Sequence, residues 1–327
     1  MQDARKDNVR LGQRIPNAAG VNLASMHAFA RVPSHRIPRM QHDAIFVLST
    51  GRCGTQWLHD AMQTCYGDLM EASHEPLKAG YQPRRFFRSS RAGLAALGDV
   101  PDVAAHVARI RAQLEHGPYF EAGWPCFAAL PWLHEALDGR LRIVHLARHP
   151  VTTAFSMATH QVYERDDWIR DGALTPFDSG CLRPALQLRW AEMSGYEKCL
   201  FWWTELHRYA LELHRRRPDI AWHATSYEAL FAPTPDALHA LVDFCGLPRR
   251  PALGALRERR TDQYHYRTWP DDWRKALQFP ETMEVAEALG YDIADTDAHA
   301  LSARYFRRKK LRHYLADWTA IGRRFAG

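Results

Sequence analysis

A turn that carries two glycines and an arginine holds the residue types best suited to bind an anion. Residues 45–48 are apolar and apolar residues return at helical spacing from Trp57, which predicts a strand, a tight turn and a helix start. Gly51 and Gly54 permit backbone angles that a Cβ atom would forbid. The N–H groups at a helix start lack intrahelical partners and point out of the positive end of the helix dipole. Because Arg52 adds a full charge, the turn fits a phosphate or sulfate group; an ordinary turn with a solvated arginine is the alternative.

A second strand-like run, residues 143–147, also ends at an arginine. Pro150 follows at a position typical of a helix start, and Ser156 lies about two turns into that helix. The guanidinium group of Arg148 is a planar donor fork that suits a phosphate, and Ser156 adds a hydroxyl donor. This segment therefore predicts a second anion contact.

Glu75 is the first candidate for proton transfer. It lies 23 residues after Arg52, which is enough for one helix and a return to the end of the next strand, and Pro76 prevents a regular helix there. In an open α/β sheet this spacing places Glu75 at the same carboxyl edge as the glycine turn. A carboxylate at that edge could accept a proton from an attacking hydroxyl group, with His74 as the second candidate. A surface acid at a strand end is the alternative.

Residues 49–57 resemble the 5′-phosphosulfate loop of sulfotransferases that use 3′-phosphoadenosine 5′-phosphosulfate (PAPS). The pattern in that family is a basic residue, a small residue, Gly, Ser or Thr, a further residue and often Trp; Arg52 is the arginine variant seen in several carbohydrate and bacterial members. The segment is not a Walker A loop, because it does not supply the lysine of that motif. The resemblance implies that this loop holds PAPS and that Trp57 stacks on adenine. The implied donor-binding residues are Thr50, Gly51, Arg52, Cys53, Gly54, Thr55, Gln56 and Trp57.

The resemblance continues at Arg148. The 3′-phosphate motif of the family is a strand, Arg, a residue that is often Asp, Pro, and Ser eight positions after the Arg. Here Ser156 has that place and His149 replaces the Asp. The resemblance implies that Arg148 and Ser156 hold the 3′-phosphate, and that Glu75 is the catalytic base, since carbohydrate sulfotransferases have Glu-Pro-Leu at this relative place.

Further matches lie toward the C-terminus. Tyr227 falls in a family pattern of Arg-Tyr-Glu-x-Leu in which Thr225 and Ser226 here replace the Arg and its neighbour, so Tyr227 and Ser226 line either the nucleotide pocket or a packed strand end. Arg259, Arg260 and Arg267 are further candidates for a basic loop over the 3′-phosphate, although the Arg-Lys-Gly triplet of cytosolic members is absent from the sequence.

The elements that must position these residues alternate between strand-like and helix-like patterns. Helical spacing is expected over residues 103–114, 126–137, 186–197, 201–215, 233–246 and 281–291, and short strands over 119–123 and from 220. Trp190, Trp202 and Trp203 are expected in the core. The resemblance implies one α/β domain over residues 42–292, a three-layer sandwich with a central parallel sheet, related to P-loop kinases. Residues 1–41 are expected to form a partly ordered lead-in and residues 293–327 a basic amphipathic helical extension.

The composition indicates which classes of ligand and which cellular setting are expected. The 327 residues are 46% hydrophobic with a formal net charge of +6, which favours anionic ligands without implying nucleic acid, and none is expected. The six cysteines are scattered without a C-x-x-C pair, so neither a zinc site nor disulfides are indicated and a reduced, cytoplasmic setting is expected. Neither a secretory h-region nor an 18-residue apolar run is present.

The basic segment 303–325 leaves its role open. It is either a terminal helix docked on its own domain or a helix that contacts a partner or, peripherally, an anionic membrane such as the inner membrane. The sequence does not decide whether the protein forms a homo-oligomer.

The sequence hypothesis is transfer of a sulfo group from PAPS, with PAP as product, to a hydroxyl or amine of a sugar, lipid, small metabolite or peptide. Arg52 and the loop N–H groups would stabilise the leaving phosphate during in-line displacement, and Glu75 would remove the acceptor proton. No metal is required by the sequence. Two alternatives stay open: a P-loop-like small-molecule kinase, and a non-catalytic module that binds an anionic lipid or a partner.

Overall fold

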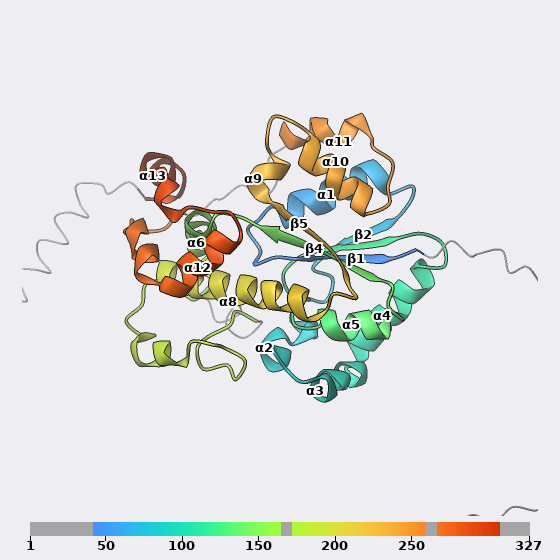
Figure 1. Ribbon diagram of the computed structural model, residues 1–327, viewed down its shortest axis with the longest axis horizontal. Coiled ribbons are helices and arrows are strands. Elements are labelled where there is room, and N and C mark those ends of the chain that lie inside the picture. The colour runs from blue at the N-terminus through green and yellow to red at the C-terminus, as the bar shows by residue number, and fades with distance from the viewer. Residues whose placement is uncertain (1–41, 165–171, 259–266, 308–327) are drawn as a thin grey trace, which may run out of the picture. The chain divides into compact units, whose positions relative to one another are not determined.

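Five parallel strands form the centre of the structure, a computed structural model that describes residues 42–164, 172–258 and 267–307. The strands are β1 (Ala44–Leu48), β2 (Glu71–His74), β3 (Tyr119–Ala122), β4 (Leu141–Ala147) and β5 (Ala221–Ser226). They pair in the order β2-β3-β1-β4-β5, and every pairing is parallel. All carboxyl ends therefore lie at one edge of the sheet (Figure 1).

Helices cover both faces of the sheet, and both sides of the central strand β1 are therefore buried. Along β1, Ala44, Phe46 and Leu48 belong to one hydrophobic core, while Ile45 and Val47 belong to the other. This two-residue alternation is the strand period, and a strand covered on both faces has no polar side. The predicted α/β class with a central parallel sheet is confirmed.

The two cores draw on different helices (Figure 1). Helices α1 (Thr55–Tyr66) and α10 (Asp236–Phe244) pack on one face, and α4 (Pro101–Gln113), α5 (Leu130–Ala136) and α8 (Gly195–Arg216) on the other. The remaining described helices are α2 (Pro83–Phe86), α3 (Arg91–Ala95), α6 (Pro150–Thr159), α9 (Tyr227–Leu230), α11 (Pro251–Ala255), α12 (Pro280–Ala288) and α13 (Ala298–Tyr305). Short 3-10 turns are η1 (Lys78–Tyr81), η2 (Ala96–Asp99), η3 (Pro184–Arg189), η4 (Leu256–Glu258), η5 (Trp273–Gln278) and η6 (Ile293–Asp295).

Helix α8 starts later than its apolar spacing suggests. The helix expected over residues 186–197 is wrong: residues 184–189 form the 3-10 turn η3, and α8 begins at Gly195. The reason is a capping box, in which the Ser194 hydroxyl accepts from the N–H of Glu197 and the Glu197 carboxylate accepts from the N–H of Ser194. Trp202 and Trp203 on this helix are buried as expected.

Two other segments differ from expectation in extent. The helix expected over 126–137 is shorter, since α5 begins at Leu130 with Pro131 in its first turn. The expected extension 293–327 lies outside the described residues beyond 307, but its first part forms η6 and α13, whose Leu301 and Tyr305 are buried. The lead-in 1–41 also lies outside the described residues. No described helix has the length and apolarity needed to cross a membrane.

Candidate functional site

The connections leaving β1 and β4 diverge, which creates the switch point of the sheet. From β1 the chain passes through α1 to β2 on one side, and from β4 it passes through α6 and α8 to β5 on the other. Open α/β sheets bind ligands in the crevice at such a point, outside the carboxyl ends of the strands. The two segments that flank it are residues 49–54 and 148–149, the same two that the sequence singled out.

Backbone conformation in the first loop depends on glycine. Gly51 and Gly54 have φ of 77° and 90°, in the left-handed region. A Cβ atom at Gly51 would lie 3.1 Å from Cδ1 of Trp124, and one at Gly54 would lie 3.1 Å from Cδ2 of Tyr227. Gly54 is also the N-cap of α1 and supplies no capping side chain. The first-turn N–H groups of α1 are therefore suited to bind an anion.

Arg52 and Arg148 meet at this point, although 96 residues separate them. Nη1 of Arg148 donates to the carbonyl oxygen of Arg52 at 2.9 Å, and Nε of Arg52 donates to Oγ of Ser156 at 3.4 Å. Arg148 is 4% exposed and Ser156 is fully buried. The structure thus brings together the three residues that the sequence assigned to opposite ends of one ligand.

Two aromatic residues fix the guanidinium group of Arg148. Nη2 donates to the hydroxyl of Tyr305 at 3.0 Å, and the group lies 4.3 Å from the ring centroid of Tyr227. Tyr227 opens α9, directly after β5, so it belongs to the same edge of the sheet. His149 does not orient Arg148 in this structure. Its backbone N–H donates to Glu228, and Nε2 of its side chain faces the carbonyl oxygen of Asp292.

The side chains of Thr50 and Cys53 hold the loop rather than face outward. Both are buried, the Thr50 hydroxyl donates to the carbonyl oxygen of Gly51 at 3.0 Å, and Sγ of Cys53 lies 3.3 Å from the same oxygen. Burial raises the pKa of the Cys53 thiol. Contributions from these two residues to ligand binding would come through the backbone.

Gln56 and Trp57 occupy the first turn of α1. The Gln56 amide donates to Asp60 at 2.9 Å. The Trp57 indole is 5% exposed, donates from Nε1 to the carbonyl oxygen of Leu256 at 2.9 Å, and has its ring centroid 4.6 Å from that of Phe231. Stacking of Trp57 on adenine stays a prediction.

Glu75 directly follows β2 and adopts a left-handed backbone, with φ of 48°. Its N–H donates to the carbonyl oxygen of Ala122 at 3.1 Å, so β3 holds it at the carboxyl edge. A Cβ atom on Gly123 would come within 2.4 Å of Cγ of Glu75. The Glu75 side chain fits at this position because Gly123 has no side chain of its own. A left-handed non-glycine residue costs energy, and such residues cluster at functional sites.

Burial raises the pKa of Glu75 to about 7, although the backbone N–H of Trp124 and the charges of Lys78 and Arg52 oppose the rise. The negative charge of Glu121 adds to it. His74, the second candidate, has Nε2 3.3 Å from Oγ1 of Thr55 and 3.8 Å from Oε1 of Glu75.

The remaining candidates lie elsewhere or are not described. Arg267 is exposed and donates from Nη1 to the carbonyl oxygen of Phe306 at 3.1 Å, which joins it to the end of α13. Arg259 and Arg260 lie outside the described residues.

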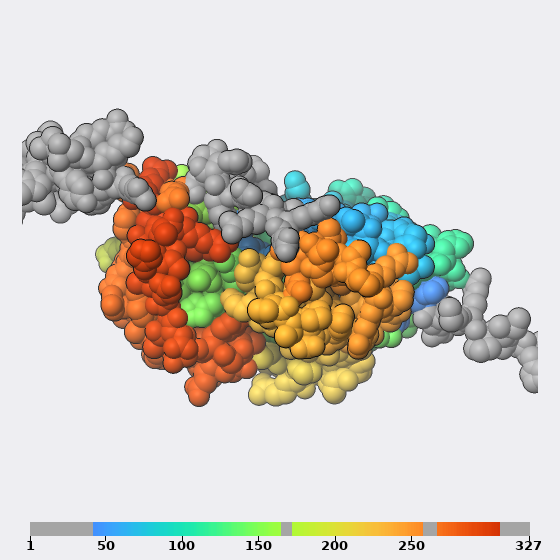
Figure 2. Space-filling view, turned by 90° about the horizontal axis from the view of Figure 1, so that it is seen from above, coloured from blue at the N-terminus to red at the C-terminus, as the bar shows by residue number. Residues whose placement is uncertain are grey.

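In a view from above, α6 is visible between the C-terminal helices and α9 to α11 (Figure 2).

Sequence reasoning missed three residues that hold the site. The adjacent indoles of Trp202 and Trp203 each donate to one of the two loops, at 3.1 Å to the carbonyl oxygen of Thr50 and at 3.0 Å to that of Arg148. Tyr305 comes from the C-terminal segment. The sequence indicated only that the tryptophans are buried, and nothing in it singled out Tyr305.

The sheet is open and parallel, and the loops that follow β1 and β4 each carry an arginine before a helix begins, which is the architecture of an α/β protein. Comparison with known proteins narrows this class. The family model of the sulfotransferase domain matches residues 42–268, which is more than half of the chain. The chain therefore belongs to the sulfotransferase family, whose members transfer sulfo groups.

The solved structures to which the chain is similar include three sulfotransferases, each with a TM-score below 0.5. The sulfotransferase domain of the Synechococcus PCC 7002 olefin synthase is 18% identical, with a TM-score of 0.47, over 77% of this chain and 96% of that one. A sulfotransferase from Alicyclobacillus acidocaldarius is 15% identical, with a TM-score of 0.45, over 76% and 96%. Mouse sulfotransferase SULT7A1, solved in complex with PAP, is 13% identical, with a TM-score of 0.39, over 80% and 89%. No sequence among the curated proteins matches the chain.

Proposed function

We propose that this protein transfers a sulfo group from PAPS to a hydroxyl or amine group of an acceptor. The observation that supports this best is the meeting of Arg52 and Arg148 at one switch point, joined by the 2.9 Å hydrogen bond between them. PAPS carries negative charge at both of its ends, on the 5′-phosphosulfate and on the 3′-phosphate. Two arginines on neighbouring loops suit such a ligand.

The loop after β1 fits the phosphosulfate end. Gly51 and Gly54 let the rings of Trp124 and Tyr227 approach the loop closely, and α1 begins there without a capping side chain. PAPS supplies an activated sulfo group on a phosphate leaving group. Arg52 and the first-turn N–H groups of α1 would stabilise the charge that builds on that phosphate.

The loop after β4 fits the 3′-phosphate. Arg148 is held by Tyr305 and by the backbone of Arg52, so little side-chain entropy remains to be lost when it binds. Ser156 adds a hydroxyl beside it. Contacts to a 3′-phosphate would also distinguish PAPS from ATP, which has none.

Glu75 would accept the acceptor proton. A general base works best when its pKa lies near the working pH, and burial raises the pKa of Glu75 to about 7. The left-handed backbone and the space at Gly123 hold the carboxylate at the same edge as Arg52.

Turnover should depend on pH through Glu75. Because only the carboxylate can accept a proton, kcat/KM should fall about tenfold for each pH unit below about 7 and level off above it. The acceptor for this measurement would come from a cell extract incubated with labelled PAPS and searched by mass spectrometry for added sulfo groups. A profile that stays flat from about pH 5.5 to about pH 8 would count against Glu75 as the base.

Arg148→Ala should weaken PAP binding about 10- to 100-fold, since charge-assisted hydrogen bonds contribute about 1.5–3 kcal/mol each. Isothermal titration calorimetry with PAP measures this directly. The control is Tyr305→Phe, which removes the hydroxyl that accepts from Nη2 of Arg148 and keeps the cation. Unchanged PAP affinity in Arg148→Ala would remove this residue from the donor site.

A thermal-shift measurement separates the proposal from the kinase alternative. We expect wild-type protein to be stabilised against heat by PAP and not by ATP with magnesium. Stabilisation by ATP with magnesium alone would overturn the assignment of PAPS as donor.

A further inference from the structure

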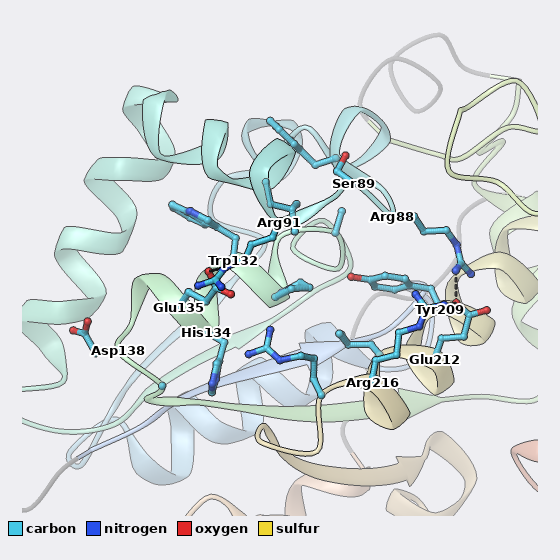
Figure 3. Close-up of a pocket in the computed structure, with 17 residues that line it drawn as sticks. Arg88, Ser89, Arg91, Trp132, His134, Glu135, Asp138, Tyr209, Glu212 and Arg216 are labelled. Carbon is cyan, nitrogen blue, oxygen red and sulfur yellow. Dashed lines mark hydrogen bonds and ion pairs between the residues drawn. The ribbon is translucent and has the colours of Figure 1, made fainter. Parts of the chain in front are cut away.

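A cavity lies on the face of the sheet covered by α8, α5 and the α2–α3 segment (Figure 3). Its volume is about 860 Å³, within the range of sites that bind small molecules. None of the residues that line it comes from 49–57 or 148–156. It is therefore a different site from the one that the arginine loops form.

Buried aromatic rings separate this cavity from the first loop. The Trp202 indole donates to the carbonyl oxygen of Thr50, and its ring centroid lies 5.7 Å from that of Phe127. Phe127 is fully buried, and its ring lies 6.3 Å from Tyr209, which lines the cavity. A ligand in the cavity would thus lie behind a packed wall and would not compete for the donor site.

Part of the cavity lining is apolar. It includes Phe86, Leu94, Trp132, Tyr209 and Leu213. The ring of Tyr209 projects into the cavity (Figure 3). A hydroxyl at an apolar wall gives a bound molecule one donor besides its hydrophobic contact.

The charge at the α8 side of the cavity is not balanced. Nη1 of Arg88 donates to the carboxylate of Glu212, and the guanidinium group of Arg216 lies 3.9 Å from the same carboxylate. The single carboxylate of Glu212 therefore pairs with two guanidinium groups. Nε and Nη2 of Arg88 are also buried without a hydrogen-bond partner among the described residues. Buried donors of this kind are costly unless a ligand or water satisfies them.

The other two arginines of the cavity have carboxylates of their own. Arg91 pairs with Glu135 at 3.0 Å, and Arg217 pairs with Asp219 at 2.7 Å. Arg216 is accordingly the cation in excess, and its side chain is 69% exposed. An apolar lining together with an excess guanidinium group is complementary to a molecule with a hydrocarbon or aromatic body and a negative head group.

We propose that this cavity binds a small organic anion, with its apolar body against Trp132, Tyr209 and Leu213 and its head group at Arg216. The head group is a carboxylate or a sulfate-type oxyanion, both of which fit a guanidinium fork. The site is independent of PAPS and of the transfer reaction.

The test is isothermal titration calorimetry of the full chain with 2-naphthoate, 2-naphthalenesulfonate and the neutral isostere 2-naphthamide. We expect one or both anions to bind at least about tenfold more tightly than the amide, because a charge-assisted hydrogen bond contributes about 1.5–3 kcal/mol. The comparison of the two anions identifies the preferred head group. Saturating PAP should leave their affinity unchanged. Equal binding of amide and anions, no binding of either anion, or displacement by PAP would overturn the proposal.

Two variants and one control locate the bound anion. Arg216→Ala should weaken binding about tenfold, whereas Arg215→Ala, at the neighbouring exposed position outside the cavity, should not change it. Leu213→Trp should fill the cavity and abolish binding. If Leu213→Trp lowers the melting temperature, the comparison of Arg216 with Arg215 decides, since both side chains are exposed. Equal affinities in these two arginine variants would contradict the proposed head-group position.

Discussion

Glu75→Gln is expected to lower kcat about 100- to 10,000-fold while PAP binding stays within about twofold of wild type. The amide keeps the size of the side chain but cannot accept a proton. Nucleotide affinity should survive because the contacts assigned to the donor come from the loops after β1 and β4, whereas Glu75 follows β2. Steady-state rates with labelled PAPS and calorimetry with PAP measure the two effects separately.

Glu71→Gln is the matched control for this variant. Glu71 lies at the opposite end of the same strand, where its carboxylate pairs with Arg109 at 3.2 Å. This substitution changes the same functional group on β2 without reaching the carboxyl edge, so turnover should stay near wild type. Near-normal turnover in Glu75→Gln would transfer the role of base to His74, which His74→Asn would then test.

Arg52→Ala should lower kcat about 100- to 1,000-fold and weaken PAP binding far less. The physical reason is that negative charge accumulates on the leaving phosphate only as the bond to sulfur breaks, so a cation beside that phosphate acts mainly on the transition state. Pre-steady-state transfer rates together with PAP calorimetry show the division between the two effects.

The comparison of the two arginines sharpens this prediction. Arg148→Ala should act mainly on nucleotide affinity and Arg52→Ala mainly on turnover, although the two residues touch. Arg52→Lys keeps a charge but loses the planar fork, and an intermediate rate is expected. If Arg52→Ala weakens PAP binding as much as it slows turnover, Arg52 holds the ground state and not the leaving group.

The local features of the site could be predicted from the sequence because they depend on backbone chemistry over a few residues. Gly51 and Gly54 mark a left-handed loop, and the structure gives both a positive φ. Pro150 marks the start of α6, and the apolar run at residues 45–48 marks a strand, which the structure buries on both faces. The spacing from Arg52 to Glu75 also placed the carboxylate at the end of the second strand.

Helix boundaries were less predictable, because two patterns competed over the same residues. Apolar spacing over 186–197 favoured a helix, but the capping box of Ser194 and Glu197 starts α8 later. Tyr305 could not be identified at all, since its contact with Arg148 joins residues 157 positions apart.

Short motifs and the periodicity of apolar residues were enough to predict the family, the parallel α/β sheet and the two arginine loops. The hydrogen bond between the two arginines, the paired tryptophans of α8 that hold both loops, and the pKa of Glu75 near 7 became visible in the folded molecule. Desolvation and long-range hydrogen bonds are properties of the packed molecule. They depend on which distant segments bury one another, and no local pattern records that.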